Sequence, residues 1–249
     1  MTSANSKQTH ASSSLWDQFW FNSTTDNARR ATLTISAQLA FELMLAERVE
    51  RILDLGCGLG EVAVLTARKS GATIVAADLS TSAVESTAST VREAGFSDQI
   101  HCVRSDCYRL GFADRSFDAV ISFGYASAAS YEGAEYEVAR VLRPGGVAII
   151  DFRNLSLYNT LLNPRAGWRI WRRYLAGDKV YHLGPRGLRK HFAAAGLDLE
   201  DIRYFNTYPP MRNLVSTASY LRLEHVGRIL GRPIARVLVA KFRRRELPG

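Results

Sequence analysis

The chain has 249 residues, of which 47% are hydrophobic and 22% are charged, close to the averages of globular proteins. This length fits one large α/β domain, and no stretch approaches the ~18 consecutive apolar residues of a membrane span. The three cysteines are too few and too irregularly spaced for a disulfide framework or a zinc site. Composition therefore excludes a membrane-spanning or disulfide-stapled protein and favours a reduced, cytoplasmic one.

Charge is distributed unevenly along the chain. Residues 1–150 carry 13 Lys and Arg against 17 Asp and Glu, whereas residues 151–249 carry 19 against 7, a net charge of +12. A basic part of this kind can favour an anionic substrate, a nucleic acid or a membrane surface. A solvated basic face explains the same charge and is the preferred interpretation.

The first residues are polar and rich in Ser and Thr, so we expect a disordered tail at 1–14 without a secretory signal. Residues 15–27 are too aromatic to stay solvated and predict a short packed helix. Residues 27–46 carry apolar side chains at helical spacing and predict a longer one.

From residue 51 onward, predicted strands and helices alternate. The sequence predicts strands at 51–55, 73–78, 100–104, 117–123, 147–152, 198–205 and 234–242, and helices at 61–69, 80–94, 132–141 and 185–196. Pro144, Gly145 and Gly146 predict a turn that separates a helix from the fifth strand. This alternation predicts an α/β fold, a mostly parallel sheet with helices on both faces. We expect one domain over 15–249, with insertions at about 155–183 and 204–230.

The strongest motif follows the first predicted strand, where Gly56, Gly58 and Gly60 alternate with Cys57 and Leu59. Glycines let the backbone bend sharply and let a ligand lie against it. The next helix points its first N–H groups at that ligand, which favours an anionic group. A nicotinamide dinucleotide site would require a further glycine where this chain has Glu61.

Acidic residues follow the next two predicted strands. Asp78 stands 24 residues beyond Asp54, where a carboxylate can accept hydrogen bonds from two ribose hydroxyls. A helix cap is the alternative role for Asp78. Asp106 could accept from the amine of an adenine or could close a turn, and Cys107 is more consistent with a small apolar contact than with a nucleophile, since no base is apparent.

Taken together, these motifs resemble the class I S-adenosylmethionine-dependent methyltransferases, and most closely their small-molecule branch. The resemblance covers about residues 30–152, including matches at 117–122 and 141–146, and extends more loosely over 185–242. It implies a Rossmann-like sheet of seven strands with the last one antiparallel, and S-adenosyl-L-methionine as cofactor. It also implies a set of cofactor-binding residues, namely Asp54, Gly56, Cys57, Gly58, Gly60, Asp78, Leu79, Asp106, Cys107 and the backbone of Phe123.

The acceptor side carries weaker signals. Candidate substrate contacts are Tyr125, Trp168, Trp171, Tyr181 and His182, and His182 is the one candidate general base, although a loop-packing histidine is the commoner case. Aromatic and basic residues in the two insertions fit a lid over the strand ends. An interfacial helix at a lipid surface and a packed cover are the alternatives.

We therefore predict methyl transfer to a small organic acceptor by direct in-line displacement. The enzyme would mainly align the acceptor opposite the sulfonium and exclude water. Two alternatives stay open: methylation of RNA or another polyanion through the basic part, and a cofactor-binding protein without transfer activity. No nucleic-acid module or metal-ligand set is apparent, peripheral membrane contact is not favoured, and the sequence carries no signal for an oligomeric state.

Overall fold

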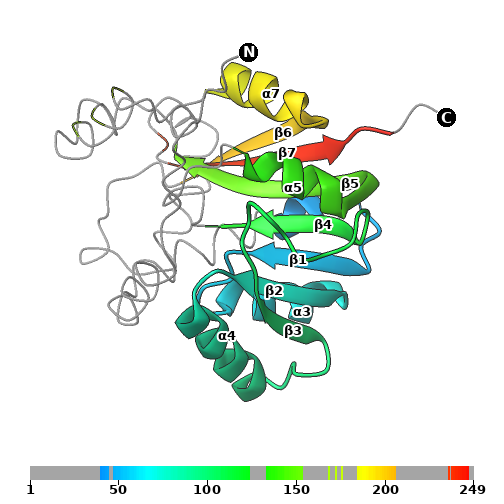
Figure 1. Cartoon of the computed structure of the whole chain (residues 1–249), viewed down its shortest axis with the longest axis vertical. Helices are drawn as coiled ribbons and strands as arrows, with labels where there is room; N and C mark the ends of the chain where they lie inside the picture. The colour runs from blue at the N-terminus through cyan, green and yellow to red at the C-terminus, as the bar shows by residue number, and fades with distance from the viewer. Residues whose placement is uncertain are drawn as a thin grey trace, which may run out of the picture.

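The computed structural model describes residues 40–44, 47–123, 133–153, 168, 172, 175, 184–205, 235 and 237–246. Within this part of the chain, seven strands form one sheet in the order β3-β2-β1-β4-β5-β7-β6 (Figure 1). The strands are β1 (Arg51–Leu55), β2 (Thr73–Asp78), β3 (Ile100–Arg104), β4 (Phe117–Ser122), β5 (Leu142–Arg153), β6 (Leu197–Phe205) and β7 (Val237–Arg244). The helices are α3 (Glu61–Ser70), α4 (Thr81–Glu93), α5 (Ala134–Val141) and α7 (Pro185–Ala194), and residues 40–44 are also helical.

The sheet is mostly parallel, as the sequence predicts. β1 pairs in parallel with β2 and β4, β2 with β3, and β4 with β5. β7 is antiparallel to both of its neighbours, β5 and β6, which confirms the expected antiparallel last strand. The chain order reverses between β1 and β4, and in open α/β sheets the ligand crevice lies outside the carboxyl ends of the strands at that point.

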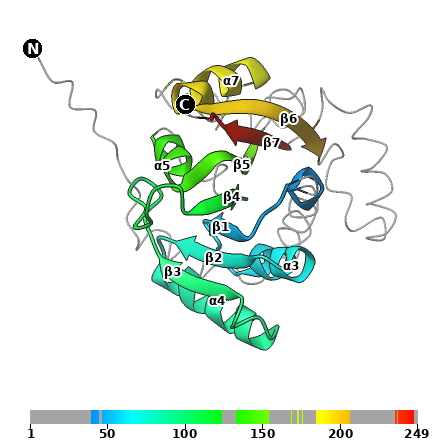
Figure 2. The same ribbon diagram turned by 90° about the vertical axis from the view of Figure 1, so that its right-hand side faces the viewer.

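Both faces of the sheet are covered by helices (Figure 2). Ile52 and Ile149 enter one hydrophobic cluster, together with side chains of residues 40–44, α3 and α4. Leu53, Ala148 and Ile150 enter the other, together with side chains of α5 and α7. Neighbouring residues of one strand face opposite sides because the side-chain period of a strand is two. The Val- and Ile-rich strands are therefore buried on both faces.

One predicted turn is instead part of a strand. β5 begins at Leu142 directly after α5, so Pro144, Gly145 and Gly146 lie inside it rather than before it. The β4–β5 register steps from Phe117–Leu142 to Ala119–Val147, which marks a bulge. Gly145 has φ +74°, and a Cβ on Gly146 would meet two backbone oxygens at 2.9 Å. The Pro-Gly-Gly segment is therefore a backbone irregularity inside β5, and the prediction that it lies as a turn before the fifth strand is wrong.

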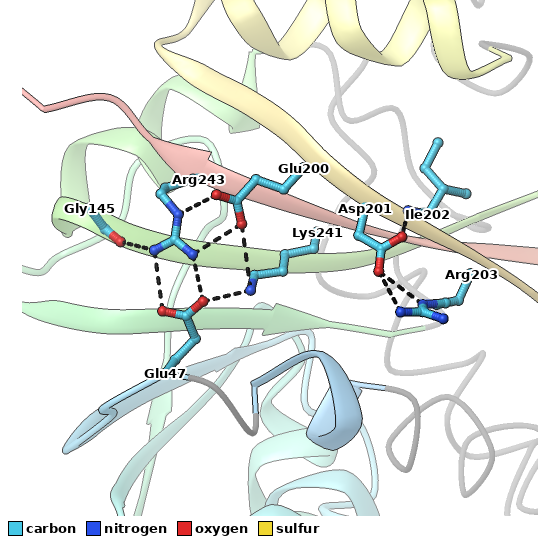
Figure 3. A network of polar contacts seen from close by, with 8 residues as sticks. All are labelled: Glu47, Gly145, Glu200, Asp201, Ile202, Arg203, Lys241 and Arg243. Carbon is cyan, nitrogen blue, oxygen red and sulfur yellow. Dashed lines mark hydrogen bonds and ion pairs between the residues drawn. The ribbon is translucent and has the colours of Figure 1, made fainter.

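A partly buried ion network joins the segment before β1 to strands β6 and β7 (Figure 3). Lys241 Nζ lies 2.6 Å from Glu47 Oε1, and Arg243 Nη2 lies 2.5 Å from the same oxygen. Arg243 also donates to Glu200 and to the Gly145 carbonyl oxygen. Hydrogen bonds from Arg243 and Lys241 hold the pKa of Glu47 below its usual range. These contacts join residues that are far apart in the sequence, and they fix the position of Glu47 at the entry to β1.

Several expectations fall on residues outside the described ranges. These are the tail at 1–14, the aromatic segment at 15–27, most of the helix at 27–46, and most of both insertions. No helix in the described ranges is long and apolar enough to cross a membrane.

Candidate functional site

The glycine-rich loop between β1 and α3 is hydrogen-bonded to the end of β2. The N–H groups of Gly56 and Cys57 both donate to the Ala77 carbonyl oxygen, at 2.8 and 3.1 Å. Gly56, Gly58 and Gly60 have φ values of 78°, 58° and 80°. Only glycine adopts this left-handed region without strain, so the alternating glycines are required by the path of the backbone.

Gly60 has a second reason to lack a side chain. A Cβ at this position would lie 2.9 Å from Cγ2 and 3.0 Å from Cα of Thr87, a residue of α4. The sequence pattern suggests that these glycines make room for a ligand. At Gly60 the room is taken by α4, which packs directly onto the loop.

Asp78 ends β2 and faces the glycine loop. Its Oδ2 accepts from the Gly58 N–H at 3.1 Å and its Oδ1 from the Ser80 N–H at 3.0 Å. The N-cap of α4 is Ser80, whose hydroxyl oxygen accepts from Ala83 N–H at 3.1 Å. The structure therefore assigns the cap to Ser80, and the Asp78 carboxylate stays at the loop, 8% exposed.

Asp54 ends up almost completely buried in β1, one strand away from Asp78. Its Oδ2 has no hydrogen-bond partner among the described residues. Burial, followed by the charge of Asp78, raises the pKa of Asp54 to about 7. A buried acceptor without a donor is rare in folded proteins, and a strongly shifted group at a strand end is typical of a functional site. The site therefore offers an acceptor for an N–H or cationic group of a ligand.

The two cysteines of the predicted site are not placed for nucleophilic chemistry. Burial, followed by the nearby Asp54 and Asp78, raises the pKa of the Cys57 thiol well above its usual range. Cys107 is buried in the cluster beneath α5 and α7. A buried thiol packed among apolar side chains behaves as a small apolar side chain itself.

Asp106 closes a turn after β3. Its Oδ1 accepts from the Tyr108 N–H at 3.0 Å, and its carbonyl oxygen accepts from the Arg109 N–H at the same distance. Asp106 therefore makes the contacts of a turn, and its contact with an adenine stays a prediction. The neighbouring Ser105 N–H donates to the Asp78 carbonyl oxygen at 2.9 Å, which ties this turn to the end of β2.

The remaining predicted residues divide into two groups. Phe123 follows β4 and is buried in the same cluster as Cys57, while Leu79 is half-buried after β2. Trp168 is helical and 68% exposed. The other acceptor candidates, Tyr125, Trp171, Tyr181 and His182, lie outside the described residues.

Two buried hydroxyl groups that the sequence analysis missed also hold the loop. Thr87 Oγ1 donates to the Gly58 carbonyl oxygen at 2.9 Å, and Ser122 Oγ donates to the Leu55 carbonyl oxygen at 2.8 Å. A serine in the buried strand of residues 117–122 is a signal that could have been recognised. A threonine in a Ser- and Thr-rich helix carries no such signal.

Comparison with known proteins identifies this arrangement. Residues 52–146 match the family described as methyltransferase domain. A demethylmenaquinone methyltransferase of Thermus thermophilus is 36% identical over 116 residues, which cover 45% of this chain and 52% of that protein. The ubiquinone/menaquinone biosynthesis C-methyltransferase UbiE of Serratia proteamaculans is 29% identical over 177 residues, covering 64% of this chain and 70% of that protein.

Solved structures agree on the fold. Phosphoethanolamine N-methyltransferase 2 of Haemonchus contortus, in complex with S-adenosyl-L-methionine, superposes with a TM-score of 0.59 at 16% identity, over 86% of this chain and 53% of that one. Matches to three of the curated relatives span between 31% and 52% of those proteins' own lengths. The motif, the sheet order and the family match lead to one conclusion: residues 52–146 match a methyltransferase domain, and the chain is similar to the class I S-adenosylmethionine-dependent methyltransferases.

Proposed function

We propose that this protein transfers a methyl group from S-adenosylmethionine to a small organic acceptor. The observation that carries the proposal is the pair of buried carboxylates around the glycine loop. Asp78 is anchored to Gly58 at the end of β2, and Asp54 presents an acceptor oxygen without a donor among the described residues. A molecule that carries an ammonium group at one end and a ribose at the other fits this pair.

Each predicted cofactor residue has a role in the proposal. Asp54 would accept from the ammonium group, and the Phe123 backbone would hold the same end of the cofactor. Asp78 would accept from the ribose hydroxyls, because a carboxylate oxygen can accept more than one hydrogen bond. Leu79, Asp106 and Cys107 would surround the adenine.

The demands on the chain are modest. The bound cofactor supplies a methyl group that its sulfonium already makes electrophilic. The protein has to align an acceptor lone pair opposite the sulfur and exclude water, which is catalysis by proximity and orientation. A general base is needed only for an acceptor that must lose a proton, and His182 is the candidate for that role.

Two observations support a small acceptor over a polyanion. The curated relatives include proteins named as quinone-biosynthesis and sterol methyltransferases. Four of the described cations after residue 150 are also paired: Arg203 with Asp201, Arg243 with Glu200, Arg245 with Asp198, and Lys241 with Glu47. Paired cations are less available to phosphates. A cytoplasmic location is part of the same proposal.

The test is a transfer assay with methyl-labelled S-adenosylmethionine and a panel of quinones, phenols, amines and carboxylic acids. Calorimetry with S-adenosylhomocysteine and with NAD accompanies it. We expect binding of S-adenosylhomocysteine, no binding of NAD, and label in at least one acceptor. Asp78→Asn, which keeps the size of the side chain, should weaken cofactor binding on the order of 2–4 kcal/mol. Binding of NAD without S-adenosylhomocysteine would refute the proposal, and cofactor binding without transfer to any acceptor would favour a binding protein.

A further inference from the structure

Thr87 reaches the glycine loop from a separate helix. It lies in α4, is fully buried, and donates its hydroxyl hydrogen to the Gly58 carbonyl oxygen at 2.9 Å. The same hydroxyl lies 3.4 Å from Cys57 Sγ. This approach is possible because Gly60 has no Cβ, which would stand 2.9 Å from the Thr87 methyl carbon.

Gly58 is consequently held at both of its backbone polar groups. Its N–H donates to Asp78 Oδ2 at 3.1 Å and its carbonyl oxygen accepts from Thr87. A contact path therefore runs from α4 through the loop to the carboxylate at the end of β2. A glycine-rich loop has more conformational freedom than any other backbone, so its conformation depends on such external bonds.

We propose that Thr87 is a positioning residue of the cofactor site, whose hydroxyl holds the glycine loop in the conformation that directs the Gly58 N–H at Asp78. This inference rests on the proposed function. Without the hydroxyl, the Gly58 carbonyl is left buried without its donor, and a buried unsatisfied acceptor is costly. The loop then shifts to regain a partner, and the Asp78 carboxylate loses the bond that orients it.

The first experiment compares two substitutions that separate the hydroxyl from the rest of the side chain. Thr87→Val keeps the branched shape and removes the hydroxyl, whereas Thr87→Ser keeps the hydroxyl and removes the methyl group. Calorimetry with S-adenosylhomocysteine should show binding about tenfold weaker in Thr87→Val and nearly unchanged in Thr87→Ser. Equal affinities in the two variants would overturn the inference.

A matched control removes a similar bond elsewhere. Ser70 donates its hydroxyl to the Thr66 carbonyl oxygen at 2.8 Å at the end of α3. Ser70→Ala should lower the free energy of unfolding in urea without changing affinity for S-adenosylhomocysteine. If Ser70→Ala weakens binding as much as Thr87→Val does, the effect of Thr87 is one of general stability and the inference fails.

A double-mutant cycle tests the path through Gly58. If Thr87 acts by orienting Asp78, the loss of affinity in the double variant Thr87→Val/Asp78→Asn should be smaller than the two single losses combined. Additive losses would contradict the path. The two proposals fail separately: a wild-type protein that does not bind S-adenosylhomocysteine refutes the proposed function, while normal wild-type binding with an unaffected Thr87→Val variant refutes only the role of Thr87.

Discussion

Asp54 and Asp78 are buried carboxylates on the neighbouring strands β1 and β2, and the charge of Asp78 adds to burial in raising the pKa of Asp54 to about 7. Their different surroundings separate their roles. Asp78 accepts two backbone N–H bonds, which stabilise a carboxylate. Asp54 Oδ2 has no such donor within the described structure, and burial favours the protonated form of Asp54 below about pH 7 in the free protein.

The first prediction concerns the pH dependence of stability. Asp54 has a higher pKa in the folded chain than its ordinary value of 3.8. Between about pH 4 and 7 the unfolded chain therefore loses this proton while the folded chain keeps it, and stability falls as pH rises. Asp54→Asn should remove this penalty, so its free energy of unfolding relative to wild type should rise from pH 4 to 8 by as much as about 4 kcal/mol. Urea unfolding at each pH measures the difference.

Asp198→Asn is the control of opposite sign. A hydrogen bond from Arg245 lowers the pKa of Asp198. This pair therefore stabilises the folded wild-type protein above the ordinary carboxyl pKa, and the stabilisation is lost as pH falls. The free energy of unfolding of Asp198→Asn, relative to wild type, should therefore fall with rising pH. The fall should be small, because both side chains are about half exposed. A flat pH profile for Asp54→Asn would show that Asp54 ionises normally.

The second prediction concerns cofactor binding and pH. An ammonium group beside Asp54 favours its ionised form, so binding should release a proton below pH 7. The dissociation constant for S-adenosylhomocysteine should then rise below pH 7 with a slope approaching tenfold per pH unit. Asp54→Asn should bind more weakly with no such slope. Calorimetry in buffers of different ionisation enthalpy counts the proton, and an equal slope in both proteins would assign the proton to another group.

The third prediction concerns Gly60. Gly60→Ala combines a left-handed backbone, φ +80°, with a Cβ 2.9 Å from Thr87, and should lower the free energy of unfolding by roughly 2–4 kcal/mol. Gly71→Ala is the matched control. Gly71 has φ +70°, but a Cβ there would have no described atom within 4 Å, so the substitution should cost only about 1 kcal/mol. Urea unfolding of both variants measures the two losses of stability. Equal losses would mean that α4 moves away from the added Cβ without a cost in free energy.

The fourth prediction concerns the network around Lys241. Glu47→Gln removes the charge that Lys241 and Arg243 share and should destabilise the fold by about 1–3 kcal/mol at pH 7, because Lys241 is only 8% exposed. The pKa of Glu47 is lowered, so this loss should shrink as pH falls through that pKa. Arg203→Gln, which breaks the exposed pair with Asp201, should change stability by no more than about 0.5 kcal/mol. Thermal unfolding of both variants provides the comparison.

Much of the fold follows from short-range patterns in the sequence. The predicted bounds 51–55, 73–78 and 100–104 coincide with β1, β2 and β3, because a buried parallel strand is a short apolar run ended by Gly or a charged residue. Asp54 and Asp78 could be singled out for the same reason, since each stands at or near the end of such a run. The Pro-Gly-Gly segment in β5 shows the limit, because Pro and Gly mark an irregular backbone without deciding between a turn and a bulge.

The amino-acid sequence alone determined the alternation of strands and helices, the glycine loop and the acidic strand ends, because hydrophobic period and backbone freedom are local properties. Only the tertiary structure decided which residue meets which: Thr87 meets Gly58, Lys241 meets Glu47, and Asp54 Oδ2 meets no donor from the described part of the chain. Lys241 and Glu47 stand 194 positions apart in the chain. Such pairings, and the burial that shifts a pKa, depend on packing between distant segments, which no local pattern encodes.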